Sequence, residues 1–186
     1  MDRVLIAEDS NTIRAMLHEI LAESGFDPLD AGDGREAIEV FERERPSAVL
    51  LDLNMPVMNG IEAMDKIKAL DGAVPVIIVT ATDDIETAID LMKRGAYDYL
   101  KKPVEPGKLI MTVKRAVEKY GLGLKVRRLQ DYKDATLEWA LGKGPEIKGI
   151  VKQLKMAADT NFSVVLQGET GTGKTHIAKI LHDMSL

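Results

Sequence analysis

An apolar run that ends in a single aspartate, Ala48-Val49-Leu50-Leu51-Asp52, constrains the fold of this chain more than any other stretch. Turn-forming residues follow it directly, among them Asn54, Pro56 and Gly60. A short apolar run bounded by turn residues is typical of a strand that is buried on both faces, as in a parallel sheet. Asp52 is therefore expected at the carboxyl end of a central strand, where open α/β sheets bind ligands. From this run alone, Asp52 could equally cap a helix or a turn.

The same alternation of strand and helix patterns extends over the first two thirds of the chain. Further runs suited to strands occur at residues 4–7, 26–30, 74–79 and 97–100, and amphipathic helical patterns separate them. Pro28 has no backbone N–H to donate to a neighbouring strand, which places its strand at a sheet edge. Five βα units in about 120 residues predict an α/β fold with a doubly wound, five-stranded parallel sheet. The flavodoxin-like order 2-1-3-4-5 fits the edge position of the second strand.

Composition narrows the class of protein. The 186 residues include 30% charged residues and have a net charge of −5, which disfavours a nucleic-acid surface over most of the chain. The absence of cysteine excludes disulfides, zinc-thiolate sites and a cysteine nucleophile. No apolar run has the length of a signal peptide core or a membrane span, so a cytoplasmic protein without a membrane partner is expected.

Acidic and basic side chains are expected to meet at the carboxyl edge of this sheet. Glu8, Asp9 and Asp52 would converge at the switch point, with Thr80 and Lys102 arriving from neighbouring strands. Three close carboxylates need a compensating cation, and Mg²⁺ prefers oxygen ligands. With Mg²⁺ bound, one carboxylate oxygen can act as a nucleophile toward a phosphoryl group. The alternative is structural: the acidic pair caps the first helix, and Lys102 pairs with a surface carboxylate.

Four segments resemble the receiver domains of two-component response regulators. They are Leu5–Ser10, Leu51–Gly60, Thr80-Ala81 and Tyr97–Pro103. The resemblance implies that Asp52 accepts a phosphoryl group from a phosphohistidine on a sensor histidine kinase. It also implies a Mg²⁺ site in which Asp9 is a direct ligand, Glu8 acts mostly through water and the Asn54 carbonyl completes the shell. Family members commonly have two aspartates in the acidic pair, so Glu8 is a mild departure.

The resemblance also implies a switch near the phosphoacceptor. Thr80 and Ala81 would contact the phosphoryl group together with Lys102, and Tyr99 would move between exposed and buried positions as Thr80 moves. The surface made by the fourth helix, fifth strand and fifth helix would change as a result. The bond between Lys102 and Pro103 is expected to be cis.

A second motif lies near the end of the chain. It comprises Gly168, Glu169, Thr170, Gly171, Thr172, Gly173, Lys174 and Thr175 and matches the pattern GxxxxGK[ST]. Ser163–Gln167 is predicted as a buried strand before it, and a helix is predicted after it. This context indicates a P-loop, in which Lys174 reaches the outer phosphates of a nucleotide and Thr175 serves Mg²⁺.

The order of receiver, helical linker and P-loop resembles NtrC-type, sigma-54-dependent transcriptional activators. Residues 1–120 would form the receiver, 121–143 a helical linker, and 144–186 the first part of the AAA+ ATPase domain. Many such activators carry an acidic residue where this chain has Thr175. The ATP site is expected to be incomplete in this chain, which is therefore predicted not to be an enzyme. Sigma-54 RNA polymerase and DNA would be bound only through parts outside it.

A possible dimer seam follows the receiver. Ile110, Val113, Val117, Tyr120 and Leu124 have the 3-4-3-4 spacing of a coiled coil, which with a receiver face predicts a homodimer. The alternative is a solvated linker helix without a partner. For the whole chain, the leading hypothesis is the phosphorylation-controlled regulatory part of a transcription activator. A P-loop nucleotide-dependent enzyme with the receiver as scaffold, and a module that takes up phosphoryl groups without passing on a signal, remain alternatives.

Overall fold

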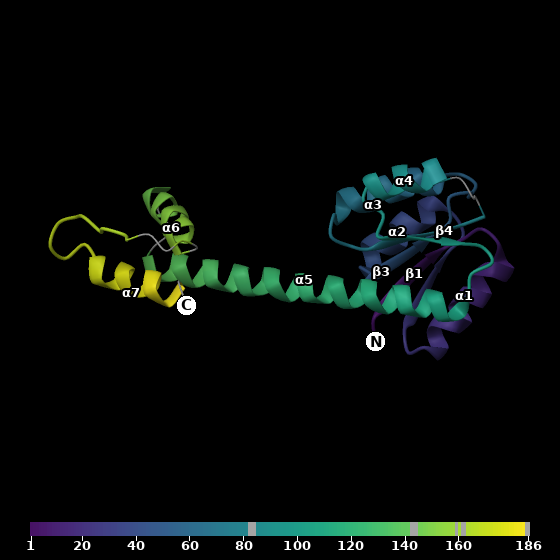
Figure 1. Cartoon of the computed structure of the whole chain (residues 1–186), viewed down its shortest axis with the longest axis horizontal. Helices are drawn as coiled ribbons and strands as arrows, with labels where there is room; N and C mark the ends of the chain where they lie inside the picture. The colour runs from purple at the N-terminus through teal and green to yellow at the C-terminus, as the bar shows by residue number, and fades with distance from the viewer. Residues whose placement is uncertain (82–84, 142–144, 159, 161–162, 185–186) are drawn as a thin grey trace. The chain divides into compact units, whose positions relative to one another are not determined.

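The computed structural model describes residues 1–81, 85–141, 145–158, 160 and 163–184. The chain divides into two compact units, Met1–Leu124 and Lys125–Leu186, which we describe separately. Figure 1 labels the helices and, where there is room, the strands.

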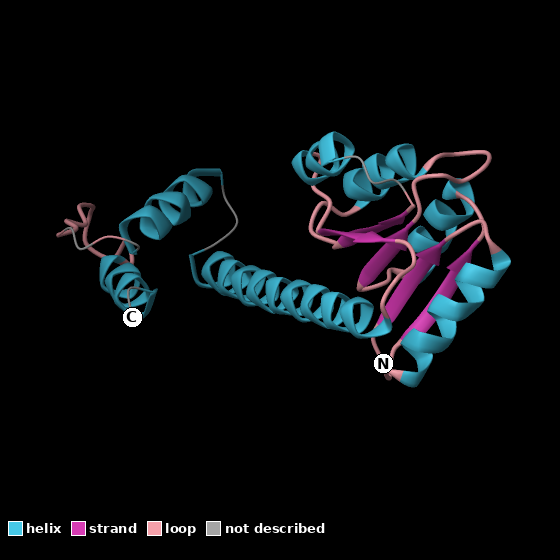
Figure 2. Cartoon of the chain, turned by 45° about the vertical axis from the view of Figure 1, so that its right-hand side comes forward, coloured by secondary structure: helices cyan, strands magenta, loops and turns pink. Residues whose placement is uncertain are grey.

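The first unit is built on one parallel sheet. Its strands are β1 (Arg3–Ala7), β2 (Asp27–Ala31), β3 (Ala48–Leu51), β4 (Val76–Thr80) and β5 (Asp98–Lys101). They pair in the order β2-β1-β3-β4-β5, with every neighbouring pair parallel. Figure 2 shows the strands of this sheet in magenta. The predicted doubly wound sheet is confirmed, and β2, which contains Pro28, is an edge strand.

Helices follow the strands in alternation. They are α1 (Asn11–Glu23), α2 (Gly34–Glu44), α3 (Gly60–Leu70), α4 (Ile85–Lys93) and α5 (Pro106–Leu141). Side chains cap the first three: Ser10 accepts from the N–H of Ile13, Asp33 from those of Arg35 and Glu36, and Asn59 from that of Glu62. These local sequence signals fix where the helices start, directly after the loops that leave the carboxyl ends of β1, β2 and β3.

The sheet has an apolar cluster on each face. Val49 and Leu51 of β3 belong to a cluster with side chains of α2, α3 and α4. Ala48 and Leu50 belong to a second cluster with side chains of α1 and α5. β3 is therefore buried on both faces, as its continuous apolar sequence predicts.

The predicted dimer seam is wrong at two of its positions. Val113 and Val117 on α5 are buried in the second cluster, beside α1 and the sheet. The 3-4 spacing of these residues marks the face of α5 that packs in its own unit, so they are not available to a second chain. α5 continues without interruption past Gly121 and Gly123.

The second unit contains α6 (Pro145–Ala158) and α7 (Lys174–Met184), which pack on each other. Val151 and Leu154 of α6 are buried. The predicted strand at Ser163–Gln167 is wrong: these residues form no regular structure, and Val165 is 79% exposed. A strand needs a neighbour that completes its hydrogen bonds, and no described residue of this unit forms one. None of the described helices is long and apolar enough to cross a membrane.

Candidate functional site

Two neighbouring strands deliver acidic residues to one edge of the sheet. Past the end of β3, the Asp52 N–H donates to the Ala7 carbonyl of β1 at 2.9 Å. Past the end of β1, the Glu8 N–H donates to the Ala31 carbonyl of β2 at 3.0 Å. Backbone hydrogen bonds thus hold both acidic residues one position beyond their strands. Glu8 and Asp52 are buried, and Asp9 is exposed.

The predicted convergence of carboxylates is confirmed. One oxygen each from Glu8, Asp9 and Asp52 lies within 4.8 Å of the other two. These residues come from the ends of β1 and β3, which are adjacent at the centre of the sheet. We call them the acidic cluster.

Lys102 reaches the acidic cluster from the loop after β5. Its Nζ donates to Oδ2 of Asp52 at 2.8 Å and lies 2.6 Å from Oε2 of Glu8. Its own backbone N–H donates to the Thr80 carbonyl at 2.9 Å, which ties the loop to the end of β4. The bond from Lys102 to Pro103 is cis, as expected.

Burial and charge perturb two groups of the site. Burial raises the pKa of Glu8, and repulsion by Asp52 adds to this, against the lowering effect of Lys102 and the Ser10 backbone N–H. Desolvation is the largest influence on the pKa of Lys102 and lowers it, but hydrogen bonds and charge attraction from Asp52 and Glu8 outweigh it and raise the pKa overall.

The donor set suits a hard divalent cation. Among the described residues, neither carboxylate oxygen of Glu8 receives a well-aligned hydrogen bond, although Lys102 forms an ion pair with Oε2. A buried carboxylate is costly unless its charge is paired, and Glu8 shares the single Lys102 ammonium group with Asp52. Three carboxylates against one lysine also leave excess negative charge, and Mg²⁺ takes oxygen ligands of this kind.

The loop after Asp52 folds back closely onto it. The Asn54 N–H donates to Oδ1 of Asp52 at 3.3 Å, and the Gly60 N–H donates to the Leu53 carbonyl at 3.0 Å. A Cβ atom at Gly60 would lie 2.0 Å from the Asp52 carbonyl oxygen, so only glycine fits there. Sequence analysis identified Gly60 only as a turn residue, because a close approach of this kind has no sequence signature of its own.

The remaining predicted residues lie at the ends of β4 and β5. Thr80 is the last residue of β4 and is fully buried, whereas Ala81 after it is exposed. Tyr99 on β5 pairs with Ile78 and packs, half-buried, against the first core cluster. Thr80 is two residues after Ile78 on β4, and side chains two residues apart on a strand share a face. Because Ile78 is the partner of Tyr99, Thr80 and Tyr99 lie on the same side of the sheet.

The P-loop motif precedes the N-terminus of α7, as predicted. Lys174 folds back so that its Nζ donates to the carbonyls of Gly168 at 3.0 Å and Glu169 at 2.6 Å. Gly171 and Gly173 have φ of 89° and 79°, a conformation that glycine adopts at little cost. The loop therefore closes around its lysine.

One residue at the acidic cluster was not identified from the sequence. Nη1 of Arg14 donates to the Glu8 backbone carbonyl at 2.6 Å. A possible signal was its position: Arg14 lies near the N-terminus of α1, where the helix dipole disfavours a positive charge.

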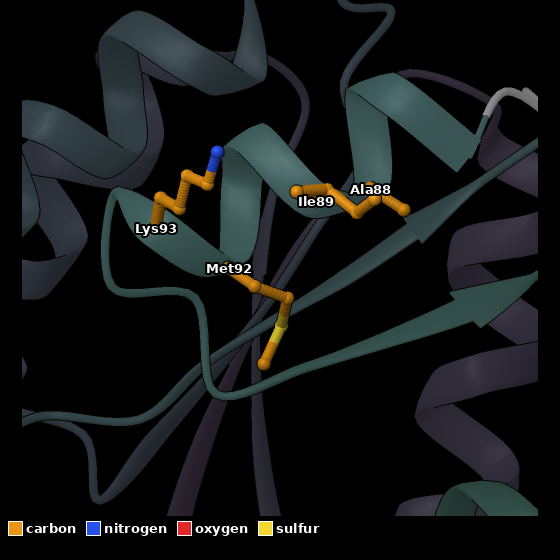
Figure 3. Close-up of a pocket in the computed structure, with 4 residues that line it drawn as sticks. All are labelled: Ala88, Ile89, Met92 and Lys93. Carbon is orange, nitrogen blue, oxygen red and sulfur yellow. The ribbon is translucent and has the colours of Figure 1, made fainter.

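A separate hollow lies on the surface of α4, and no residue of the acidic cluster lines it. It has a volume of about 470 Å³ and is lined by Ala88, Ile89, Met92 and Lys93, which project from α4 (Figure 3). Ile89 and Met92 are about half exposed. This face of α4 is apolar, but it contributes nothing to the acidic cluster.

Comparison with known proteins identifies both parts of the chain. Residues 4–114 match the response regulator receiver domain, and residues 140–186 match the sigma-54 interaction domain. The chain is 34% identical over 184 residues to the regulatory protein AtoC of Escherichia coli K12, covering 98% of this chain and 40% of AtoC. It is 31% identical over 179 residues to the DNA-binding transcriptional regulator NtrC of the same organism, covering 96% of this chain and 38% of NtrC.

Solved structures agree with these matches. The crystal structure of NtrX from Brucella abortus in complex with ADP has a TM-score of 0.65 and 26% identity, covering 98% of this chain and 40% of that chain. The signal receiver domain of a LuxO repressor protein from Vibrio parahaemolyticus has a TM-score of 0.64 and 32% identity, covering 67% of this chain and 96% of that chain.

The prediction that the protein is not an enzyme is wrong. That prediction rested on the incompleteness of the ATP site within this chain. Residues 140–186 match the sigma-54 interaction domain, and the chain spans only about 40% of the length of its relatives. The incomplete ATP site is therefore no evidence against an enzyme.

The receiver match extends over more than half of the chain, and the second match begins near the end of α5. The alignments with AtoC and NtrC cover 98% and 96% of this chain, and so include both matched domains. The chain therefore belongs to the response regulator receiver family, in the NtrC-type group that joins a receiver to a sigma-54 interaction domain.

Proposed function

We propose that this chain is the phosphorylation-dependent regulatory part of a sigma-54 activator, with Asp52 as its phosphoacceptor. The observation that carries the proposal is the meeting of three carboxylates within 4.8 Å, two of them paired with Lys102, at the carboxyl edge of the sheet. The phosphoryl donor would be a phosphohistidine of a sensor histidine kinase.

Asp9, Asp52 and the Asn54 carbonyl would hold Mg²⁺ directly, and Glu8 would act mostly through water. When bound, Mg²⁺ would neutralise the carboxylates and polarise the phosphoryl oxygens. The burial of Glu8 and the exposure of Asp9 support this division, since an exposed carboxylate is accessible to a cation from solvent.

The transfer itself needs only the Asp52 carboxylate as nucleophile. One Asp52 oxygen attacks the phosphorus atom, an O–P bond forms, and the P–N bond to the histidine breaks with its electron pair going to the ring nitrogen. Lys102, which donates to Oδ2 of Asp52 at 2.8 Å, is placed to move its hydrogen bond onto a phosphoryl oxygen.

Thr80 and Ala81 would contact the new phosphoryl group and move in response to it. Thr80 ends β4, and its carbonyl accepts from the Lys102 N–H, so a shift at either residue is transmitted to the other. Tyr99, on the same face of the sheet as Thr80, would then change its packing and alter the surface of α4, β5 and α5.

A homodimer would use that surface together with α5 beyond the receiver core. Leu122, Val126 and Leu129 have exposed fractions of 56%, 54% and 64% and follow a 4-3 spacing. This spacing places them on one face of α5. We assign the dimer contact to these exposed residues and not to Val113 and Val117, which are buried in the receiver core.

The P-loop of residues 168–175 would bind the phosphates of ATP. Its position before α7 supports this role, since helix N-termini favour anions. Lys174 would exchange the carbonyls of Gly168 and Glu169 for phosphate oxygens, and Thr175 would serve Mg²⁺. Sigma-54 RNA polymerase and DNA would be partners of the longer protein.

Acetyl phosphate and Mg²⁺ test the central proposal. Intact-mass spectrometry should show a single phosphoryl adduct on the wild type and none on Asp52→Asn, and chelation of Mg²⁺ should abolish it. Asp30→Asn, an exposed change of the same kind on β2, serves as the control. An adduct of equal yield on Asp52→Asn would place the chemistry at another residue.

A further inference from the structure

The peptide group that joins Glu8 to Asp9 is held by a side chain from α1. The Glu8 N–H is fixed on β2 by its hydrogen bond to the Ala31 carbonyl at 3.0 Å. The Glu8 carbonyl accepts from Nη1 of Arg14 at 2.6 Å. Because this carbonyl belongs to the peptide between the two acidic residues, holding it restrains the backbone from which both carboxylate side chains extend.

Arg14 is itself fixed in place. Its backbone N–H donates to the Ser10 carbonyl at 2.9 Å, and its Nη2 donates to Oδ1 of Asn11. The guanidinium group also passes close to Gly32, where an added Cβ would lie 3.8 Å from Nη1. A half-buried guanidinium with two directed hydrogen bonds is an anchor, since its planar fork loses little freedom on binding.

The position of Arg14 is not explained by the stability of α1. A cation near a helix N-terminus is disfavoured by the helix dipole, and the first turn of α1 has no acidic residue to offset it. The hydrogen bonds to the Glu8 carbonyl, six residues earlier, and to Asn11 together account for the side-chain direction.

We propose that Arg14 is a positioning residue for the divalent cation at the acidic cluster. It holds the Glu8–Asp9 peptide so that the exposed Asp9 carboxylate and the buried Glu8 carboxylate face the same point as Asp52. The inference rests on the proposed function, because it assigns Arg14 to the Mg²⁺ site of that function. Residues that orient metal ligands typically contribute about 10- to 100-fold to metal affinity.

Positioning and charge predict opposite results when Arg14 is replaced by an uncharged residue. Loss of a positive charge near three carboxylates would strengthen Mg²⁺ binding by simple Coulomb attraction. Loss of the hydrogen bond to Glu8 would weaken it, because the ligands would no longer be held in place. The sign of the change therefore separates the two roles.

Isothermal titration of the full chain with Mg²⁺ measures this sign. Arg14→Met should bind Mg²⁺ about tenfold more weakly than the wild type. Arg14→Lys, which keeps the charge and one donor, should recover part of the affinity. Arg35→Met, an exposed change of equal charge at the start of α2, should bind like the wild type. Saturating Mg²⁺ should restore the rate at which Arg14→Met is phosphorylated by acetyl phosphate.

Each outcome decides the question. Unchanged or tighter Mg²⁺ binding by Arg14→Met, with normal binding by the wild type, would overturn the inference alone. If Arg14→Met fails to fold in a urea titration, Arg14→Ala, which also removes the charge and the donors, takes its place, and unchanged or tighter binding by it would overturn the inference in the same way. A wild type that binds no Mg²⁺ would overturn the proposed function together with this inference.

Discussion

The Lys102 ammonium group lies 2.8 Å from the Asp52 carboxylate, although the two residues are fifty positions apart in the chain. It also lies 2.6 Å from Glu8, so one lysine from the loop after β5 compensates carboxylates at the ends of β1 and β3. Lys102 thereby links three strands at the edge where phosphoryl transfer is proposed. The side chain is only 14% exposed, which makes water a poor substitute for these partners.

Lys102→Met should destabilise the protein in the absence of Mg²⁺. Removing one partner of a buried ion pair leaves uncompensated charge, and such losses cost about 3 kcal/mol. Mg²⁺ should reduce this difference, because it supplies positive charge to the same carboxylates. Urea unfolding with and without Mg²⁺ measures both effects, with Lys108→Met on the exposed face of α5 as the control. A difference that Mg²⁺ leaves unchanged would contradict this account.

Gly60→Ala should destabilise the loop that follows Asp52. The new Cβ would lie 2.0 Å from the Asp52 carbonyl oxygen, so the loop must move. Overpacking of this kind costs about 1 to 3 kcal/mol. Gly107→Ala on α5, where nothing lies within 4 Å, should be neutral or stabilising. Equal urea midpoints for the two variants would show that the loop has more room than the structure indicates.

Thr80→Ala should accept the phosphoryl group but respond weakly to it. Shifting a two-state switch from 1:99 to 99:1 requires about 5.5 kcal/mol. Hydrogen bonds from Lys102 and Thr80 to the phosphoryl group would together supply about 2 to 4 kcal/mol, so losing the hydroxyl removes a substantial share. Sedimentation with and without acetyl phosphate measures the response. Thr80→Ser, which keeps the hydroxyl, should respond like the wild type, and a full response by Thr80→Ala would exclude this route.

Local patterns were sufficient to predict the receiver fold and its acidic cluster. The run from Ala48 to Leu51 has no polar residue that could face solvent, so its burial on both faces followed from the sequence. Parallel strands bring their carboxyl ends to one edge, and the convergence of Glu8 and Asp52 followed from that geometry.

Other features depend on partners that a sequence pattern does not identify. The spacing of Val113 and Val117 shows that a face of α5 is buried, but not whether the receiver core or a second chain covers it. Ser163–Gln167 has the composition of a strand but no neighbouring strand among the described residues. The contact of Arg14 with the Glu8 carbonyl joins a side chain to a backbone atom, which leaves no periodic signal.

Because of Lys68, the free energy of unfolding should change with pH in the alkaline range. Its Nζ donates to the Val74 carbonyl at 2.7 Å, and desolvation lowers its pKa below 10.5 despite the nearby Asp71. Between the lowered pKa and 10.5, the unfolded chain binds more protons at this site, so stability should rise with pH. Relative to Lys68→Met, the wild type should thus gain stability across that interval in urea titrations. A relative loss of stability for the wild type across that interval would reverse the assigned sign.

Substitutions along α5 should separate folding from association. Val117 is 8% exposed and packs in the receiver core, so Val117→Asp would bury an unpaired charge and should unfold the receiver. Val126 and Leu129 are 54% and 64% exposed, so the double variant Val126→Asp and Leu129→Asp should keep the urea midpoint of the wild type. If this stripe joins two chains, the double variant should sediment as a monomer under conditions in which the wild type is a dimer. Dimers that persist in the double variant would restrict the interface to the receiver surface, and a folded Val117→Asp variant would contradict the packing of α5 against the sheet.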